Sequence, residues 1–378
     1  MSSVIDGSPY RPAVPPIAQR AMRAIAVNRW FIAASLVYAI TGLIVARQLG
    51  VAEQYNTAQS FTLEHNFIRQ FMIFGLIGAA FVLAHLLYVF VFLRPKQPLR
   101  YLRESFFEIN RMPERLLIAL PILILLPISL TVFSSLKVMI PLIHPFDWDP
   151  TFIAWDGWLH GGVQPWELLQ PILGFPYVTQ IINIFYDAWF FLLFLCAFVM
   201  AFKLTPPRLR MQFFLTLLVS WSLLGNLMAA ALASVGPAFY GLLSGGPDPF
   251  APLMEYLNAA NEQYEIGALQ VQAWLWSAYE AKENAVGRGI SAMPSIHVSS
   301  ALQFALVWWR LNRFVGVLMA IFCAVILLGS VHLGYHYAID GYVSIPLTWL
   351  IWHVIGRLLD RDRSLDNDEL PETQNRGS

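Results

Sequence analysis

Long hydrophobic runs divide this chain into segments that are each long enough, or nearly so, to cross a lipid bilayer. A transmembrane helix needs about 20 consecutive, mostly apolar residues. Eight runs between the charged residues approach or reach that length, at 30–46, 70–93, 116–140, 178–202, 212–235, 294–310, 314–334 and 337–357. The pattern therefore predicts an all-α fold, a polytopic membrane helical bundle with about eight transmembrane helices.

Composition supports a protein whose main partner is the lipid bilayer. Of the 378 residues, 57% are hydrophobic and only 13% are charged, and the formal net charge is zero. A neutral chain offers no general attraction to nucleic acid, so that partner is not expected. The two cysteines, Cys196 and Cys323, lie inside apolar runs, which excludes a disulfide framework and a zinc site built from cysteines. No feature of the sequence indicates an oligomeric state.

Positively charged residues predict the side of the membrane that each connecting segment faces, because cytoplasmic loops hold more Lys and Arg. One set of alternating segments holds most of them: Arg11, Arg20, Arg23, Arg29, Arg94, Lys96, Arg100, Arg103, Arg111, Arg115, Lys203, Arg208, Arg210, Arg310, Arg313, Arg357, Arg361, Arg363 and Arg376. The opposite set holds Arg47, Arg69, Lys282 and Arg288, and Lys137 lies inside a span. Both termini are therefore predicted to be cytoplasmic.

The ends of the chain are polar. No short cleavable leader precedes the first apolar run, so residues 1–29 are predicted to form a cytoplasmic tail before an uncleaved membrane anchor. Residues 359–378 are polar and are predicted to form a disordered cytoplasmic tail.

Two outward-facing segments carry more than connecting sequence. Residues 144–170 combine four tryptophans with several aspartates, and residues 265–287 have the pattern of an amphipathic helix lying along the membrane interface. Both segments fit an aromatic belt that holds loops at headgroup depth. The alternative is a lid that screens a lipid headgroup.

Histidines are expected to converge at the outer face. The spans 294–310 and 314–334 form a hairpin that turns at 310–313, and its two outer ends lie at His297 and at His332/His336. At about 1.5 Å of rise per residue, both ends reach the same membrane face at similar depth. Packing of the spans would then bring His297 and His336 together.

The stretch "GSVHLGYHYAID", residues 329–340, places His332, His336 and Asp340 four residues apart. A helix break near Gly334 would put His336 and Asp340 on one face at the start of the last span. Asp340 could then accept a hydrogen bond from one ring nitrogen of His336 and make the other more basic.

The opposite stretch, "SAMPSIHVSS", supplies the start of the other helix. Pro294 suits the first helical position, and Ser295 could cap the helix or contact a ligand with its hydroxyl. Free backbone N–H groups at two helix N-termini would favour phosphate. Together with His332, Arg288 and Lys282 they predict an anion pocket.

Three other interpretations of these polar residues stay open. His332, His336 and Asp340 could hold zinc, or they could be ordinary interfacial polar groups. The chain could also be a lipid or solute transporter, because Asp187, Asn226 and His85 lie inside spans; interhelical hydrogen bonds are the simpler explanation for these three. Lys137 is expected to extend towards the outer end of its span.

The two motifs resemble the type 2 phosphatidic acid phosphatase superfamily of membrane enzymes. That family's second signature, Pro-Ser-x-His, is matched by Pro294-Ser295-Ile296-His297, and its third ends in His-x-x-x-Asp, matched by His336-Tyr337-Ala338-Ile339-Asp340. The resemblance implies a six-helix catalytic core over residues 116–358. Residues 30–115 are then two additional N-terminal transmembrane helices.

This chain departs from the family pattern at its cationic positions. The first signature, Lys-x6-Arg-Pro, is not found intact before Pro294, and Gly329-Ser330 replaces the usual Ser-Arg of the third signature. Ser295, His332, Arg288 and Lys282 are therefore the expected phosphate contacts by position. The missing Arg and the His-Tyr-x-x-Asp sequence are similar to the branch that contains inositol phosphorylceramide synthases and sphingomyelin synthases.

The resemblance implies a metal-independent, cofactor-free lipid phosphatase or phosphotransferase. His336 would be the nucleophile that forms a phosphohistidine, Asp340 would orient it, and His297 would protonate the leaving alkoxide. The substrate would be a lipid phosphate or phospholipid, and the acceptor water or an alcohol. The enzyme would be a multi-pass protein, of the inner membrane if bacterial, with its active site on the non-cytoplasmic side.

Overall fold

The computed structural model describes residues 16–51, 68–204, 206–281, 289–362 and 365, and these residues form helices and no strand. Seven of the helical segments are long and apolar enough to cross a membrane. The described part of the chain is therefore an all-α, polytopic helical bundle, as the hydrophobic runs predict. An integral, multi-pass membrane protein follows from these helices.

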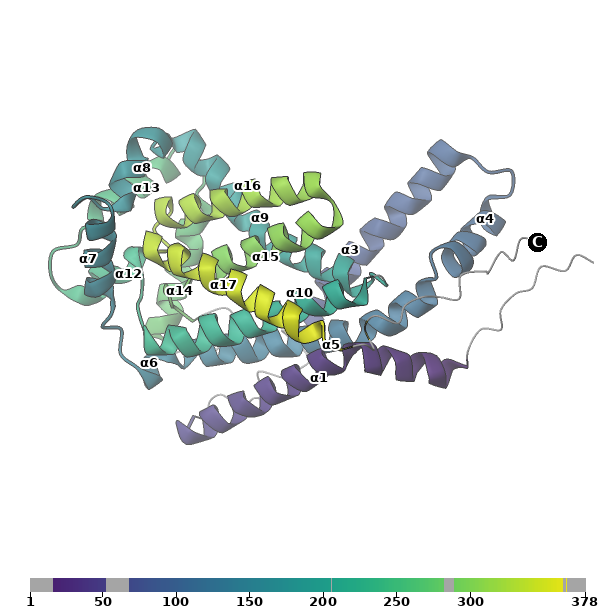
Figure 1. Ribbon diagram of the computed structural model, residues 1–378. Helices are drawn as coiled ribbons and strands as arrows, with labels where there is room; N and C mark the ends of the chain where they lie inside the picture. The colour runs from purple at the N-terminus through teal and green to yellow at the C-terminus, as the bar shows by residue number, and fades with distance from the viewer. Residues whose placement is uncertain (1–15, 52–67, 205, 282–288, 363–364, 366–378) are drawn as a thin grey trace, which may run out of the picture.

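Most of the long helices run side by side, and a helix lies over each predicted span (Figure 1). Their bounds are α1 Ile17–Gln48, α3 Ile68–Leu87 continued by the π-helix η2 Tyr88–Leu93, α5 Met112–Val138, α9 Pro176–Ala201, α10 Pro207–Ser222 continued by the π-helix η4 Leu223–Met228 and α11 Ala229–Ala231, α15 Ile296–Leu311, α16 Arg313–His332 and α17 Ala338–Leu359. Helix α1 begins at Ile17, whereas the apolar run begins only at Trp30, because its first turns are helical but basic. α3 leaves the main bundle and is mostly exposed.

One predicted span is shorter than expected. Helix α15 has only 16 residues and is not among the seven helices long enough to cross a membrane. The cause lies just before it, because residues 290 and 292–295 are buried and enter the bundle without helical structure. Ala292 N–H donates to the Ser234 carbonyl at 3.1 Å, and Ser295 N–H donates to the Asp340 carbonyl at 3.3 Å. α15 therefore begins inside the bundle.

Short helices form a cap at one end of the bundle (Figure 1). They are α6 Ile140–Ile143, α7 Asp149–Leu159, α8 Pro165–Leu173, α12 Pro237–Ser244, α13 Ala251–Asn261 and α14 Gly267–Glu280. The interfacial helix predicted over 265–287 corresponds to α14, and its last residues lie outside the described part of the chain. At the other end, α4 Pro98–Glu104 and the π-helix η3 Ser105–Ile109 link α3 to α5.

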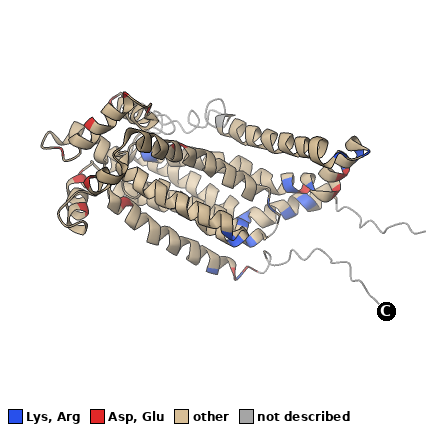
Figure 2. Ribbon diagram, turned by 90° about the horizontal axis from the view of Figure 1, so that it is seen from above, with Lys and Arg blue, Asp and Glu red and all other residues tan. Residues whose placement is uncertain are grey.

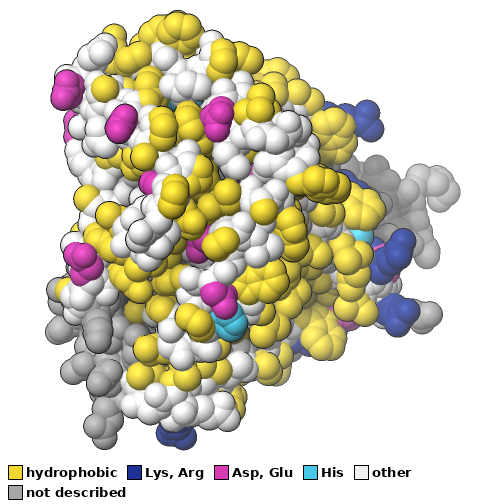
Figure 3. Space-filling view, turned by 90° about the vertical axis from the view of Figure 1, so that its left-hand side faces the viewer, with side chains coloured by type: hydrophobic (Ala, Val, Ile, Leu, Met, Phe, Trp, Pro, Cys, Tyr) yellow, Lys and Arg dark blue, Asp and Glu magenta, His cyan; other side chains and the backbone are white. Residues whose placement is uncertain are grey.

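Charge separates the two ends of the bundle. Most Lys and Arg gather at the end opposite the cap, as Figure 2 shows, and this is the end that the loop charges predict to be cytoplasmic. The face of the cap carries hydrophobic and acidic side chains, with Lys and Arg at its margins (Figure 3).

A buried arginine joins four helices near the basic end. The side chains of Arg210 and Asn28 are both fully buried. Arg210 Nη1 donates to Asn28 Oδ1 at 2.8 Å, and its Nη2 donates to the Ile118 carbonyl at 2.9 Å. Its Nε donates to the Ala201 carbonyl at 3.3 Å. Because α1, α5, α9 and α10 each supply a group, the guanidinium fixes their relative positions.

Other polar residues inside the spans also form hydrogen bonds within the bundle. Asn226 accepts from the Tyr38 hydroxyl and donates to the Phe133 carbonyl at 3.1 Å. His85 Nε2 lies 3.0 Å from the Ser105 hydroxyl, and Asp187 accepts from Asn183 at 2.9 Å. Asn226 and His85 therefore form hydrogen bonds between elements, which is the simpler of the two explanations for polar residues inside spans.

We predict that Arg210→Met lowers the free energy of unfolding by about 2–4 kcal/mol, because buried oxygens on three other helices lose a donor. Denaturant unfolding in detergent micelles measures the change. Arg313→Met is the matched control, since Arg313 is exposed at the start of α16. Equal stability of the two variants would contradict the structural role of Arg210.

Candidate active site

The polar stretch 329–340 is the junction between α16 and α17. α16 ends at His332, and Gly334 has φ +74°, a left-handed conformation that favours glycine. The chain then doubles back, so that the N–H groups of Tyr335 and His336 both donate to the Ser330 carbonyl, at 2.9 and 3.0 Å. This junction places His336 directly before the first turn of α17.

His336 and Asp340 form a buried pair. The Nδ1 atom of His336 lies 3.0 Å from Oδ2 of Asp340, and the Tyr337 N–H donates to the same oxygen at 3.0 Å. Asp340 is completely buried and His336 is 5% exposed. The carboxylate therefore holds Nδ1 of His336, and Nε2 is the ring nitrogen that it does not hold.

His297 faces this pair from the first turn of α15. Its ring centroid lies 5.8 Å from that of His336. Tyr186 and Trp189 of α9 line the other side, with centroids 4.8 and 4.3 Å from the His297 ring. His297 is partly exposed, unlike His336. The structure thus brings the two histidines together on one side of the helical hairpin.

Ser295 connects the two helices that carry the histidines. Its Oγ accepts from the Val298 N–H at 3.4 Å and so caps α15, while its own N–H donates to the Asp340 carbonyl. The side chain is completely buried. Pro294 lies before the helix and is not its first residue, which corrects the position expected for it.

Two aspartates of the acidic, Trp-rich segment clamp the junction. Asp156 accepts from the N–H groups of Ala338 and Ile339 at 2.7 and 2.9 Å. Asp149 accepts from the Tyr337 hydroxyl at 2.7 Å and from the N–H groups of Val235 and Gly236, each at 3.0 Å. The N-terminus of α17 is therefore already occupied by a carboxylate. The expectation that it offers free N–H groups to phosphate is wrong.

His332 does not join the two other histidines. Its Nε2 lies 2.8 Å from the hydroxyl of Thr179 on α9, and its ring packs against Tyr256 of α13. The side chain is completely buried. Because His332 and His336 have different partners, they form no zinc site with Asp340. Among the described residues, no three metal-ligating side chains come together.

Lysine 137 is a site residue that the sequence analysis missed. Its charge acts on His336 and His297, and the chain at Gly289 packs against its backbone. A relaxed version of the first family signature would have found it, because Lys137 is followed by six residues and then by His144-Pro145. The expected cations Lys282 and Arg288 lie outside the described residues.

Burial sets the charge state at this junction. It lowers the pKa of His336 to about 3, and the positive charge of Lys137 acts in the same direction, while a hydrogen bond with the Ala292 backbone opposes it. Burial also raises the pKa of Asp149 and Asp156, although the groups that donate to them oppose the shift. His336 is therefore a neutral imidazole at neutral pH, the form that can act as a nucleophile.

Comparison with known families agrees with this site. A family model of the PAP2 superfamily matches residues 150–354, more than half of the 378 residues. The chain therefore belongs to the PAP2 superfamily, whose members are phosphatase-type enzymes that act on phosphoesters. The match includes His297, His336 and Asp340 but begins after Lys137. No curated protein and no solved structure matches the chain.

We predict that Lys137→Met moves the acid limb of the pH profile of kcat/KM to higher pH. A nearby positive charge disfavours the protonated imidazole of His336, so its removal raises the pKa of His336. Rates of phosphoester cleavage measured across pH test this. The control is Arg47→Met, which removes a charge from an exposed position on α1. An unmoved acid limb in Lys137→Met would argue against the proximity of the two groups.

Proposed function

We propose that the protein is a membrane-embedded lipid phosphatase or phosphotransferase that works through a phosphohistidine on His336. The observation that carries this proposal is the buried pair of His336 and Asp340, with His297 facing it at a ring distance of 5.8 Å. Two histidines and one carboxylate supply a nucleophile, its orienting group and a general acid.

In the first half-reaction, Nε2 of His336 attacks phosphorus while the bond from phosphorus to the ester oxygen breaks. Asp340 accepts the hydrogen bond from Nδ1 and stabilises the positive charge that develops on the ring. His297 donates its proton to the leaving alkoxide. A positioned general acid contributes about 10²–10⁴-fold to such a step.

In the second half-reaction, an incoming hydroxyl cleaves the phosphorus–nitrogen bond. His297, now neutral, takes the proton from water or an alcohol, and the oxygen attacks phosphorus as Nε2 of His336 leaves. The negative charge on the transferring group needs cations or N–H groups. Lys137 supplies a cation whose charge acts on both histidines, and the start of α15 offers the N–H groups of its first turn.

The substrate is an amphipathic phosphoester that reaches the site from the membrane leaflet on the capped side. The site lies where the long helices meet the cap, on the side that the loop charges predict to be non-cytoplasmic. Tyr186 and Trp189 are buried and pack on the His297 ring, so they position this histidine beside the proposed substrate site.

The acceptor is either water or an alcohol, because both use the same first half-reaction. The resemblance to inositol phosphorylceramide synthases favours an alcohol. Asp149 and Asp156 of the acidic, Trp-rich segment are bound to backbone and tyrosine groups, so these two carboxylates are not available to bind a polyol acceptor.

We predict that His336→Ala and His297→Ala each abolish cleavage of lipid phosphoesters, because each removes a group that the displacement requires. Release of phosphate or headgroup from the full-length protein in detergent measures this. His85→Ala is the matched control, because His85 lies on α3, away from the site, with its Nε2 3.0 Å from the Ser105 hydroxyl. Full activity in either site variant would refute the assignment.

We predict that activity survives incubation with EDTA, since no step above uses a metal. The readout is headgroup release from a labelled phospholipid panel. Loss of activity in EDTA with recovery in zinc would contradict the metal-independent mechanism.

The same panel, with and without ceramide, diacylglycerol and inositol as acceptors, identifies the second half-reaction. Free phosphate or phosphoryl headgroup would identify a phosphatase, and a new labelled lipid would identify a transferase.

A further inference from the structure

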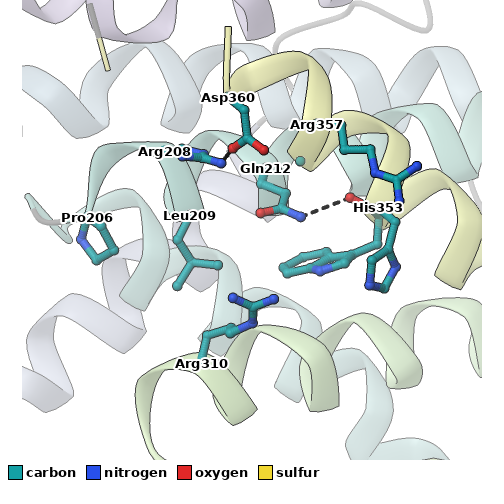
Figure 4. Close-up of a pocket in the computed structure, with 10 residues that line it drawn as sticks. Pro206, Arg208, Leu209, Gln212, Arg310, His353, Arg357 and Asp360 are labelled. Atoms are coloured by element: carbon teal, nitrogen blue, oxygen red, sulfur yellow. Dashed lines mark hydrogen bonds and ion pairs between the residues drawn. The ribbon is translucent and has the colours of Figure 1, made fainter. Parts of the chain in front are cut away.

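A cavity lined by several arginines lies at the basic end of the bundle, far from the histidines. It has a volume of about 450 Å³ and is formed where α10 begins and where α15 and α17 end. Figure 4 shows Arg208, Arg310 and Arg357 arranged around it, each from a different helix. Thirteen residues of α15 separate His297 from Arg310, which corresponds to about 20 Å along the helix. The cavity is therefore not part of the candidate active site.

The cavity carries uncompensated positive charge. Arg208 forms an ion pair with Asp360, the acidic residue of its lining. Arg310 and Arg357 make no hydrogen bond or ion pair with another described residue. Both side chains are exposed. Three guanidinium groups thus face a single carboxylate. An anion is the ligand that this balance favours, and the planar fork of Arg suits the oxygens of a phosphate.

The floor of the cavity is rigid and partly apolar. Gln212 Nε2 donates to the Trp352 carbonyl at 2.9 Å, which joins α10 to α17. Gly356 allows this approach, because a Cβ there would lie 2.6 Å from Gln212 Nε2. Trp352 is buried, and Leu209 and Pro206 complete an apolar wall. A ligand with both a phosphate and an apolar part fits this lining better than a free anion does.

The position of the cavity identifies the source of such a ligand. It lies at the ends of long apolar helices, at the depth where lipid headgroups meet water. The loop charges predict that this end is cytoplasmic, and the cytoplasmic leaflet is the one that carries anionic lipids. We propose that Arg310 and Arg357, with Gln212 and Trp352 as the floor, bind the phosphate headgroup of an anionic phospholipid from that leaflet. This proposal does not depend on the reaction proposed above.

The experiment titrates purified full-length protein in detergent micelles with phosphatidylglycerol, phosphatidylcholine or inorganic phosphate and counts bound lipid by native mass spectrometry. We expect saturable binding of phosphatidylglycerol that the double variant Arg310→Gln/Arg357→Gln weakens by about 30-fold, since each Lys or Arg adds roughly fivefold at an anionic surface. The matched control is Arg313→Gln/Arg361→Gln, which removes the same charge from the same end but outside the cavity. Lipid that binds at the histidines adds the same amount of bound lipid in the unchanged protein and in both double variants, so it does not affect the comparison.

Several results would overturn the proposal. An equal loss in the control pair would mean that lipid binding follows total charge and not this cavity. Equal affinity for phosphatidylcholine, or full displacement of phosphatidylglycerol by millimolar inorganic phosphate, would exclude an anionic lipid as the ligand. If the double variant fails to fold, Arg310→Gln alone decides the question. Its expected loss is about fivefold, and no loss would refute the role of Arg310.

Discussion

The first turn of α17 depends on two buried carboxylates, and the geometry of the candidate active site depends on that turn. Asp156 accepts from the N–H groups of Ala338 and Ile339, and Asp340 accepts from the Tyr337 N–H. These N–H groups have no partners inside the helix, and leaving them unpaired in an apolar interior would be costly. Because both carboxylates are fixed, His336 is held in a single position beside Asp340.

The same arrangement limits what can bind a phosphoryl group. A helix N-terminus that already holds a carboxylate does not offer the same N–H groups to a second anion, so the start of α17 positions His336 and provides no anion site. The start of α15 differs, because Ser295 satisfies only the Val298 N–H there. In the proposed reaction, Lys137 would supply the positive charge that the occupied helix end cannot. The start of α17 would then position the nucleophile, and α5 with α15 would meet the charge of the substrate.

Much of the fold could be predicted from the sequence, because hydrophobic length determines a membrane helix without reference to distant residues. The closeness of His297 and His336 was predictable for a similar reason, since both lie at the outer ends of one predicted hairpin. Asp156 and Lys137 were harder, because their roles depend on contacts between segments far apart in the chain. In the sequence, Asp156 is one of several acidic residues in a Trp-rich segment, and Lys137 is a single charge near the end of an apolar run. His332 misled the sequence analysis because its spacing matches that of His336, whereas its side chain turns towards α9.

The two ends of the bundle hold opposite charges: buried carboxylates at the capped end and arginines at the other. At the capped end, the carboxylates of Asp149, Asp156 and Asp340 accept hydrogen bonds from backbone N–H groups, a tyrosine and a histidine inside the protein, and burial keeps His336 neutral. At the basic end, Arg210 donates hydrogen bonds to groups on three other helices, whereas Arg310 and Arg357 have no acidic partner among the described residues. α15 and α17 each carry a residue of the site at one end and an arginine of the cavity at the other. The proposed lipid site and the candidate active site are therefore built on opposite ends of the same two helices.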